Sequence, residues 1–240
     1  MRELRSVLAM FLGAMVIARA AEQDDRECVV LLHGVALSGW AMQPLARAVE
    51  EAGYRAVNVS YPSRTLPLEE IARDFLPAQL AAHGVAAAPR VHFVTHSMGS
   101  LVVRAYLRDR RPANLGRVVM LGPPNHGSVA ADAAVEWAPL RWLVGVNLPR
   151  LGTGEAGVAP RLGRADFELG IIAGTSRVNP LFETVLKGEH DGVVTLESAR
   201  LDGMSDFLVV PHSHTVMLWR KEVIAQVVEF LRHGKFRRGL

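Results

Sequence analysis

Residues 91–104, VHFVTHSMGSLVVR, place a serine where a buried strand passes into a helix. Residues 91–95 form a short apolar and β-branched run that is typical of a strand, and apolar residues recur at helical spacing over 97–109. Such a turn holds the Ser97 hydroxyl at a helix N-terminus, where the helix dipole and free backbone N–H groups favour developing negative charge. Ser97 is therefore predicted to be an exposed nucleophile. The alternative is a serine that only caps the helix.

Strand and helix patterns alternate on both sides of this junction. Strands are predicted over residues 27–33, 55–60, 91–95, 117–121, 168–173 and 207–210, and helices over 40–52, 68–83, 97–109 and 221–230. Alternation at these lengths predicts an α/β fold with a mainly parallel sheet and helices on both faces. Functional residues are then expected at the carboxyl ends of the strands.

The alternation is interrupted between about residues 126 and 165. Residues 129–143 are apolar and include Trp137 and Trp142, and residues 144–163 are rich in glycine and proline without clear periodicity. We interpret this stretch as an insertion that forms a small lid, meaning a segment that covers the site; a buried packing helix is the ordinary alternative. No linker divides the chain, so residues 21–240 are predicted to form one domain.

The first 20 residues have the composition of a secretory signal peptide. A short basic segment precedes an apolar run over residues 7–18, and Ala18-Arg19-Ala20 offers small residues to a signal peptidase. The run is shorter than the roughly 20 apolar residues that span a bilayer. The chain is therefore predicted to be exported to the periplasm or the medium, with a retained anchor or a buried core helix as alternatives. Cys28 is the only cysteine, so no internal disulfide can form.

Charge and motifs argue against nucleic acid, nucleotide and metal partners. Of 27 basic and 24 acidic side chains, 24 and 23 lie beyond residue 20, which leaves a net charge of +1 and no basic face. No G-x-x-x-x-G-K-[ST] loop occurs and no G-x-G-x-x-G follows the first strand, so no cofactor is expected. His190, Asp191, His212 and His214 could ligate a metal, but no H-E-x-x-H or paired-cysteine pattern supports a zinc site, and none is expected.

Histidines and acidic residues follow the later predicted strands. PHSHT at residues 211–215 comes after the last strand, and either His212 or His214 could take a serine proton near neutral pH. GEHDGVVT at residues 188–195 offers a carboxylate that would orient this histidine, although an Asp-Gly pair is also an ordinary turn. On chemistry alone, three acidic residues compete for this role: Asp191, Glu189 and Glu183.

The segment around Ser97 resembles the nucleophile elbow of the α/β-hydrolase superfamily, in its lipase and esterase branch, which is usually written G-x-S-x-G. Gly99 keeps the second glycine of that motif, whereas Thr95 replaces the first and is expected to crowd the turn. LLHGVALSGW at residues 31–40, where the first strand runs into a glycine turn, resembles the segment that supplies a backbone donor to the substrate carbonyl in these enzymes. By that resemblance, the N–H groups of Val35 and Met98 form the oxyanion hole.

Further blocks extend the resemblance over nearly the whole chain beyond the signal. The D-G-V-V motif resembles the acid loop of lipase-like relatives and implies Asp191 as the acid, and S-H-T implies His214 as the base. The order Ser, Asp, His is that of the superfamily. GPPNHGS at residues 122–128 resembles the G-x-P-x-x-G-S run of secreted lipases, which either shapes an acyl site or is a rigid turn.

Together these residues predict a serine hydrolase that cleaves a carboxylic ester through an acyl-enzyme on Ser97, without a cofactor. His214 would remove the Ser97 proton and Asp191 would orient His214. The substrate class, a small-molecule or lipid ester, follows from the resemblance alone. Two alternatives stay open: an acyltransferase of the same fold, and a catalytically silent relative that acts as a binding module or chaperone. The apolar insertion leaves peripheral membrane contact open, and the sequence does not specify the oligomeric state.

Overall fold

Six parallel strands form one sheet in the computed structural model, which describes residues 24–177 and 182–239. The strands are β1 (Cys28–Leu32), β2 (Arg55–Val59), β3 (Val91–His96), β4 (Leu115–Leu121), β5 (Leu169–Gly174) and β6 (Asp206–Val210). Their order is β2-β1-β3-β4-β5-β6, and every neighbouring pair is parallel. The predicted α/β fold with a mainly parallel sheet is confirmed. The predicted signal peptide, residues 1–20, lies outside the described residues.

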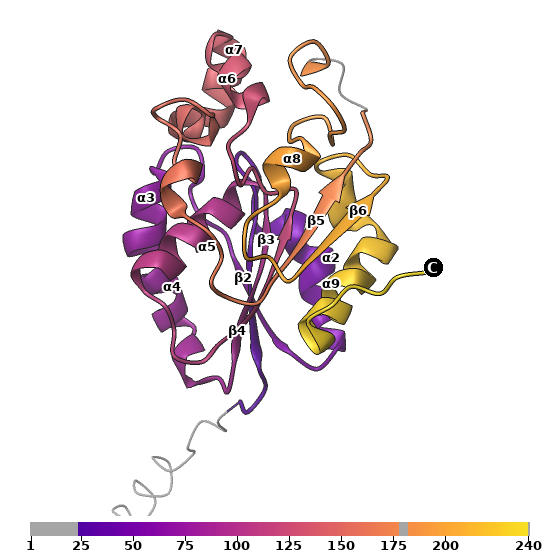
Figure 1. Cartoon of the computed structure of the whole chain (residues 1–240). Helices are drawn as coiled ribbons and strands as arrows, with labels where there is room; N and C mark the ends of the chain where they lie inside the picture. The colour runs from indigo at the N-terminus through magenta and orange to yellow at the C-terminus, as the bar shows by residue number, and fades with distance from the viewer. Residues whose placement is uncertain (1–23, 178–181, 240) are drawn as a thin grey trace, which may run out of the picture.

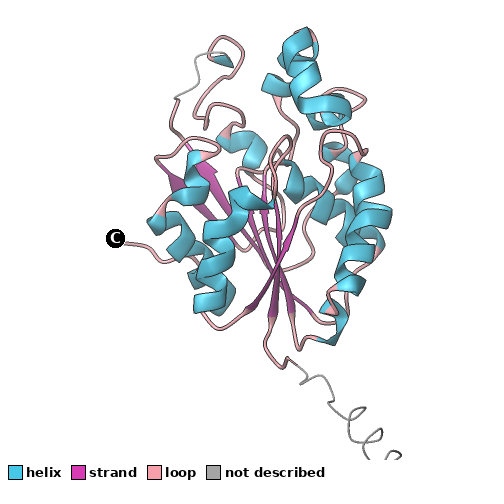
Figure 2. Ribbon diagram, turned by 180° about the vertical axis from the view of Figure 1, so that it is seen from behind, coloured by secondary structure: helices cyan, strands magenta, loops and turns pink. Residues whose placement is uncertain are grey.

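Helices cover both faces of the sheet, as Figures 1 and 2 show from opposite sides. The helices that pack on the sheet are α2 (Gln43–Glu51), α3 (Leu68–Glu70), α4 (Leu76–Ala82), α5 (Met98–Asp109) and α9 (Lys221–His233). Side chains of α2 and α9 pack on one face, and those of α3, α4 and α5 pack on the other. In the part of the chain that the structure describes, no helix is both long enough and apolar enough to cross a bilayer.

Successive residues of β1 point to opposite faces of the sheet, as the pleat of a strand requires. Cys28, Val30 and Leu32 pack into the core shared with α3, α4 and α5, which we call the larger core. Val29 and Leu31 pack into the core shared with α2 and α9. Both faces of β1 are therefore buried, which is why its sequence is a continuous apolar run rather than an alternating one.

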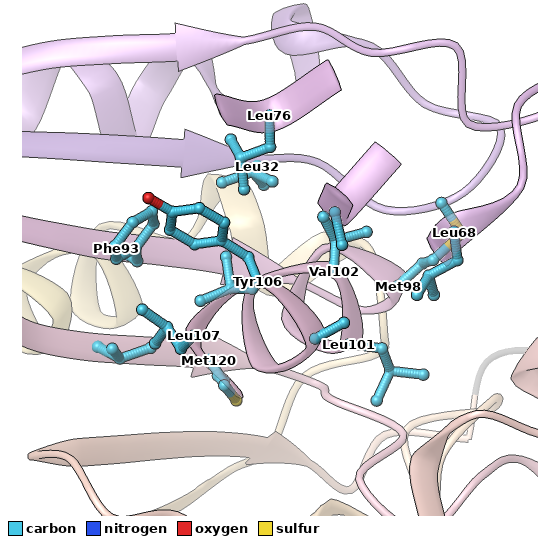
Figure 3. Close-up of a cluster of buried hydrophobic side chains, with 14 of the residues drawn as sticks. Leu32, Leu68, Leu76, Phe93, Met98, Leu101, Val102, Tyr106, Leu107 and Met120 are labelled. Atoms are coloured by element: carbon cyan, nitrogen blue, oxygen red, sulfur yellow. The ribbon is translucent and has the colours of Figure 1, made fainter. Parts of the chain in front are cut away.

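Figure 3 shows part of the larger core, between the sheet and α5. Leu32, Phe93 and Met120 come from three adjacent strands, and Leu101 and Tyr106 come from α5. Phe93 is fully buried, and its ring centre lies 6.1 Å from that of Tyr106. Burial of a side chain of this kind contributes about 1.5–3 kcal/mol. These contacts fix the position of the helix that begins directly after Ser97.

The helix predicted over residues 68–83 contains a π-helical segment, η2 (Ile71–Phe75), between α3 and α4. Pro77 lies in the first turn of α4. A proline has no N–H to donate to the carbonyl of Arg73 four residues earlier, and its ring would clash with that carbonyl. A widened turn at this place avoids the clash.

Residues 126–165 form short helices between β4 and β5. The elements are α6 (Val129–Val135), α7 (Ala138–Val144), η4 (Gly145–Asn147), η5 (Pro149–Leu151) and η6 (Ala159–Leu162). α6 and α7 lie beyond the carboxyl ends of the strands, at the top of Figure 1. The glycine- and proline-rich part, which showed no periodicity, folds into 3-10 turns that begin at or beside Pro149 and Pro160.

Asn147 fastens this insertion to the loop after β2. Its Nδ2 donates to the carbonyls of Ser63 (2.7 Å) and Leu66 (2.8 Å), and its Oδ1 accepts from the Leu68 N–H (2.8 Å). Asn147 is fully buried, so these bonds satisfy an amide that would otherwise be costly to bury. The insertion is therefore held to the sheet by a specific polar contact as well as by apolar packing.

The topology gathers four loops at one edge of the sheet. After β1 the chain forms the outer strand β2 and then returns to β3 on the other side of β1, so the direction of winding reverses between β1 and β3. Ligands of open α/β sheets bind outside the carboxyl ends of the strands at such a point. The loops after β1, β3, β5 and β6 carry Val35, Ser97, Asp191 and His214, respectively.

Candidate active site

Ser97 has a strained backbone between β3 and α5. Its φ of 51° and ψ of −122° are rare for an L-residue, and Ala36 is the other non-glycine residue of the described chain with a positive φ. Such conformations cost about 1–3 kcal/mol and concentrate at functional sites. The Ser97 side chain makes no capping hydrogen bond to α5, so it is not a helix cap. It is only 7% exposed, because it lies in a cavity rather than on the open surface that was predicted.

Two neighbours of Ser97 explain how the tight turn is accommodated. A Cβ on Gly99 would lie 2.7 Å from the Leu32 carbonyl oxygen and 2.8 Å from that of His33, so glycine is required there. Thr95 is fully buried, and its Oγ1 lies 2.8 Å from Oγ of Ser100. The turn accommodates Thr95, because its hydroxyl has a hydrogen-bond partner in the first turn of α5.

Asp191 and His214 are hydrogen-bonded to each other. Oδ2 of Asp191 lies 2.7 Å from Nδ1 of His214, while Oδ1 accepts from the N–H groups of Val193 (3.0 Å) and Val194 (2.8 Å). Both side chains are buried. Since an ionised carboxylate only accepts hydrogen bonds, Nδ1 of His214 carries the proton and Nε2 is free to take another. This is the protonation state that a general base requires.

The residues that competed with this pair are engaged elsewhere. Nε2 of His212 lies 2.7 Å from the exposed Oε1 of Glu222. Glu183 lies beside a different histidine, with Oε2 at 3.8 Å from Nε2 of His190. Glu189 is exposed. The contacts therefore select Asp191 and His214, a choice that the residue types alone left open.

Two backbone N–H groups beside Ser97 are available as donors. Met98 is the first residue of α5, so its N–H has no partner within the helix. Within the described residues, the Val35 N–H donates to no acceptor. The preceding Gly34 packs against Ser97, since a Cβ built on it would lie 3.1 Å from Cβ of Ser97. Paired donors in this position can stabilise an oxyanion.

A cavity of about 240 Å³ is lined by Ser97, His214 and mostly apolar side chains. Its walls come from the loop after β1, from α6, α7 and the turns of the insertion, and from the loop that follows β5. Among the described residues, Ser97 Oγ and His214 Nε2 are not within hydrogen-bonding distance, but both side chains face this one space. The structure therefore brings Ser97, His214 and Val35 to a common cavity and places Asp191 directly behind His214.

The GPPNHGS segment forms both a turn and a wall of this cavity. Gly122 has a φ of 54°, and a Cβ there would lie 3.0 Å from Nδ1 of His214 and 3.1 Å from Oδ2 of Asp191. Pro124 and Ser128 line the cavity. Because Gly122 has no Cβ, Asp191 and His214 have the space to form their hydrogen bond.

His96 contacts His214 and was not among the site residues predicted from the sequence. It is 1% exposed, its Nε2–H donates to the backbone carbonyl of His214 (2.9 Å), and the two ring centres are 4.8 Å apart. Burial, together with the neighbouring His214, holds the pKa of His96 well below its usual range. A neutral His96 therefore fixes the His214 backbone. The position of His96 directly before Ser97 is the one feature of the sequence that could have indicated that His96 fixes the His214 backbone.

Three buried histidines are expected to make the fold sensitive to acid. Burial lowers the pKa of His33, His92 and His96 below the ordinary 6.5. Each therefore binds fewer protons when folded than when unfolded, so its contribution to stability is complete above that pH and is lost as the pH falls. We expect the free energy of unfolding to decrease below about pH 6.5, by at most about 1.4 kcal/mol per pH unit for each histidine.

Urea unfolding at a series of pH values measures this dependence. His92→Gln removes one of the three histidines, the one that lies at the end of the sheet remote from Ser97. It should make the free energy of unfolding depend less steeply on pH. Equal free energies of unfolding at about pH 7.5 and about pH 5 would contradict the expectation.

No three His, Cys, Asp or Glu side chains gather into a possible metal site in the described ranges. Of the four residues weighed as ligands, Asp191 and His214 bind each other and His212 pairs with Glu222. The Nδ1 of His190 accepts the Gly192 N–H (3.1 Å).

Known proteins share this fold. The sequence profile of the alpha/beta hydrolase family matches residues 29–230. No curated protein matches the chain. Among solved structures, the mature lipase BlEst2 of Bacillus licheniformis is 21% identical, with a TM-score of 0.62 over 81% of this chain and 87% of that one. The esterase RhEst1 of Rhodococcus sp. ECU1013 is 16% identical, with a TM-score of 0.61 over 88% and 92%.

A third similar structure is the phospholipase PlaB of Legionella pneumophila, 18% identical with a TM-score of 0.65. The match covers 87% of this chain but 60% of PlaB. At such identities the solved structures establish a common fold, whereas the family profile spans most of the sequence. The chain belongs to the alpha/beta hydrolase family.

Proposed function

We propose that the protein is a serine hydrolase that cleaves carboxylic esters through an acyl-enzyme on Ser97. The observation that carries this proposal is the buried Asp191–His214 pair, 2.7 Å apart, whose histidine shares an apolar cavity with a strained serine. Membership of the alpha/beta hydrolase family and structural similarity to a lipase, a phospholipase and an esterase support the same class.

Acylation follows from the positions of these groups. Oγ of Ser97 attacks the ester carbonyl carbon, and its proton passes to Nε2 of His214. The carbonyl oxygen becomes negative and accepts hydrogen bonds from the N–H groups of Val35 and Met98. Asp191 stabilises the imidazolium that forms. The carbon–oxygen bond to the alcohol then breaks, and the alcohol leaves with the proton from His214.

Deacylation repeats these steps with water. His214 takes a proton from a water molecule, which attacks the acyl carbon and forms a second tetrahedral intermediate in the same oxyanion hole. The bond to Ser97 Oγ breaks, Oγ regains its proton from His214, and the carboxylic acid leaves. No step needs a group other than these side chains, the two backbone donors and water.

Hydrolysis of p-nitrophenyl esters tests the proposal, together with labelling by a fluorophosphonate probe. We expect release of p-nitrophenol and a covalent adduct that peptide mass spectrometry places on Ser97. A folded chain that neither turns over any ester nor reacts at Ser97 would overturn the proposal. Product analysis with added glycerol distinguishes hydrolysis from acyl transfer, because a transferase would yield glyceryl esters.

The cavity favours an apolar acyl group of limited length. Its volume of about 240 Å³ holds about eight groups the size of a water molecule, at roughly 30 Å³ each. A methylene group is of similar size, so an acyl chain of several carbons fits. Ala130, Ala131 and Ala134 form one wall, on α6, where small side chains leave this space open.

Ala134→Leu is expected to shorten the preferred acyl chain. The added carbons would occupy the cavity, so kcat/KM for p-nitrophenyl octanoate should fall about tenfold or more relative to p-nitrophenyl acetate. Ala133→Leu is the matched control, because Ala133 is the preceding residue of α6, is half-buried and does not line the cavity. If Ala134→Leu lowers kcat/KM equally for the two esters, the acyl chain does not bind in this cavity.

We also propose that α7 and its flanks contact lipid. Trp137, Trp142, Leu143 and Val146 are strongly exposed, and Leu143 also lines the cavity. Exposed tryptophans favour the boundary between water and acyl chains. Trp142, 74% exposed, should therefore matter most. Trp142→Ser is expected to reduce partition into lipid vesicles several-fold while hydrolysis of soluble p-nitrophenyl acetate stays unchanged. Unaltered partition would contradict the contact.

A further inference from the structure

The buried histidine His33 directly precedes Gly34 in the turn that carries the Val35 N–H. His33 is fully buried, and its Nδ1 lies 2.7 Å from the carbonyl oxygen of Gly34. Its Nε2 accepts the backbone N–H of Tyr61 (3.2 Å). The Tyr61 hydroxyl donates to the His33 carbonyl, and the two rings stack with centres 4.1 Å apart and planes 8° from parallel.

These contacts select one tautomer of His33. The Tyr61 N–H can only donate, so Nε2 must be unprotonated, and Nδ1 then carries the hydrogen that binds Gly34 O. Burial lowers the pKa of His33 and so favours this neutral form. Tyr61 is itself buried, which leaves the ring little freedom to turn.

The bond from His33 orients the peptide unit between Gly34 and Val35. The described chain has no cis peptide bonds, so the C=O of Gly34 and the N–H of Val35 point in opposite directions. When the carbonyl faces the His33 ring, the N–H faces away from it. The other end of the turn is also held, because the Ala36 N–H donates to Oγ of Ser63 (3.1 Å) from a backbone with a φ of 57°.

We propose that His33 is a positioning residue for the oxyanion hole. It touches neither Ser97 nor the cavity, and it acts by aiming the Val35 N–H at the place where the carbonyl oxygen becomes negative. This inference rests on the proposed ester hydrolysis. It predicts that loss of the His33 ring impairs the tetrahedral transition state more than it impairs substrate binding.

The test compares three variants in p-nitrophenyl butyrate hydrolysis. His33→Leu removes the shorter of the two bonds to the Gly34 carbonyl and leaves the longer one from the Leu37 N–H (3.3 Å). It should lower kcat about 10- to 100-fold with KM within about twofold, because a displaced donor costs less than the roughly 10²–10³-fold of a deleted one. His33→Asn keeps an N–H donor at the δ position and should restore at least about fivefold of the lost kcat. The rate of phosphonylation of Ser97 by a fluorophosphonate should fall in parallel.

His92→Asn is the matched control. His92 is also a fully buried histidine in a strand region, bonded to Glu27 (3.0 Å) and to the Arg117 N–H (2.9 Å) at the opposite end of the sheet. This variant should be less stable but should retain the parent kcat and KM within about twofold. A His33→Leu variant with the parent kcat, or one whose loss is confined to KM or thermal stability, would overturn the proposal.

NMR of the unaltered protein tests the same inference without a variant that has to fold. The ¹⁵N resonances of the His33 ring should be those of the Nδ1–H tautomer at neutral pH. An Nε2–H tautomer or a charged ring would refute the proposed orientation. A parent chain that shows this tautomer but hydrolyses no ester would instead refute the proposed function, so the two failures are distinguishable.

Discussion

Ser97→Ala is expected to lower kcat for p-nitrophenyl butyrate by about 10⁴- to 10⁶-fold, because it removes the hydroxyl that we propose forms the acyl-enzyme. The fold should survive the change. Alanine has the same Cβ as serine, so the change adds no backbone clash at the φ of 51° that Ser97 adopts. Initial rates, fluorophosphonate labelling and thermal unfolding of parent and variant provide the measurement.

Ser100→Ala is a suitable comparison for this variant. Ser100 lies one turn along α5, is fully buried and bonds to Thr95 instead of facing the cavity. It should lose some stability and keep most of its activity. If Ser97→Ala retains more than about a tenth of the parent rate, Ser97 is not the nucleophile. If the parent is inactive and both chains bind the same ligand equally, the silent-relative alternative is favoured.

Asp191→Asn should lower kcat by about 10⁴-fold, as a wrong histidine tautomer does in serine proteases. Oδ1 of the asparagine can still accept the N–H groups of Val193 and Val194, which leaves its amide nitrogen facing His214. Two donors cannot share a hydrogen bond, so Nδ1 of His214 would give up its proton and Nε2 would hold it. A protonated Nε2 cannot receive the Ser97 proton.

Glu189→Gln is the control for Asp191→Asn, since Glu189 lies in the same loop but is exposed. Its activity should stay within about twofold of the parent. The affinity of Asp191→Asn for a non-reactive substrate analogue should also change little, because Asp191 does not line the cavity. If kcat falls little in Asp191→Asn but strongly in Glu189→Gln, Glu189 and not Asp191 is the carboxylate that orients His214.

The fold was predictable because its signals are local. The inner strands β1 and β5 are short apolar runs, and burial on both faces makes those runs continuous. The π-helical segment before Pro77 was missed because the helical spacing of apolar residues conceals a missing backbone donor. The 3-10 turns of the insertion were missed because glycine and proline remove the periodicity on which a helix prediction depends.

The candidate site was predictable in part. The junction of a strand with a helix pointed to Ser97, but the choice of Asp191 over Glu189 depends on which carboxylate the fold buries beside His214. The roles of His33 and His96 could not be derived, because both depend on partners distant in the sequence or on backbone carbonyls. Residue types specify what chemistry is available, and the long-range contacts decide which residue performs it.

The left-handed backbone at Ser97 lowers the stability of the folded protein, although the proposed catalysis needs a serine at this position. Glycine adopts a positive φ without steric cost, and its extra unfolded-state entropy of about 0.5–1 kcal/mol is smaller than a strain of about 1–3 kcal/mol. Directed evolution that rewarded survival at high temperature alone would therefore tend to replace this serine with glycine. It would yield a more heat-stable protein without the proposed nucleophile, so any such selection on this chain needs ester turnover as a second criterion.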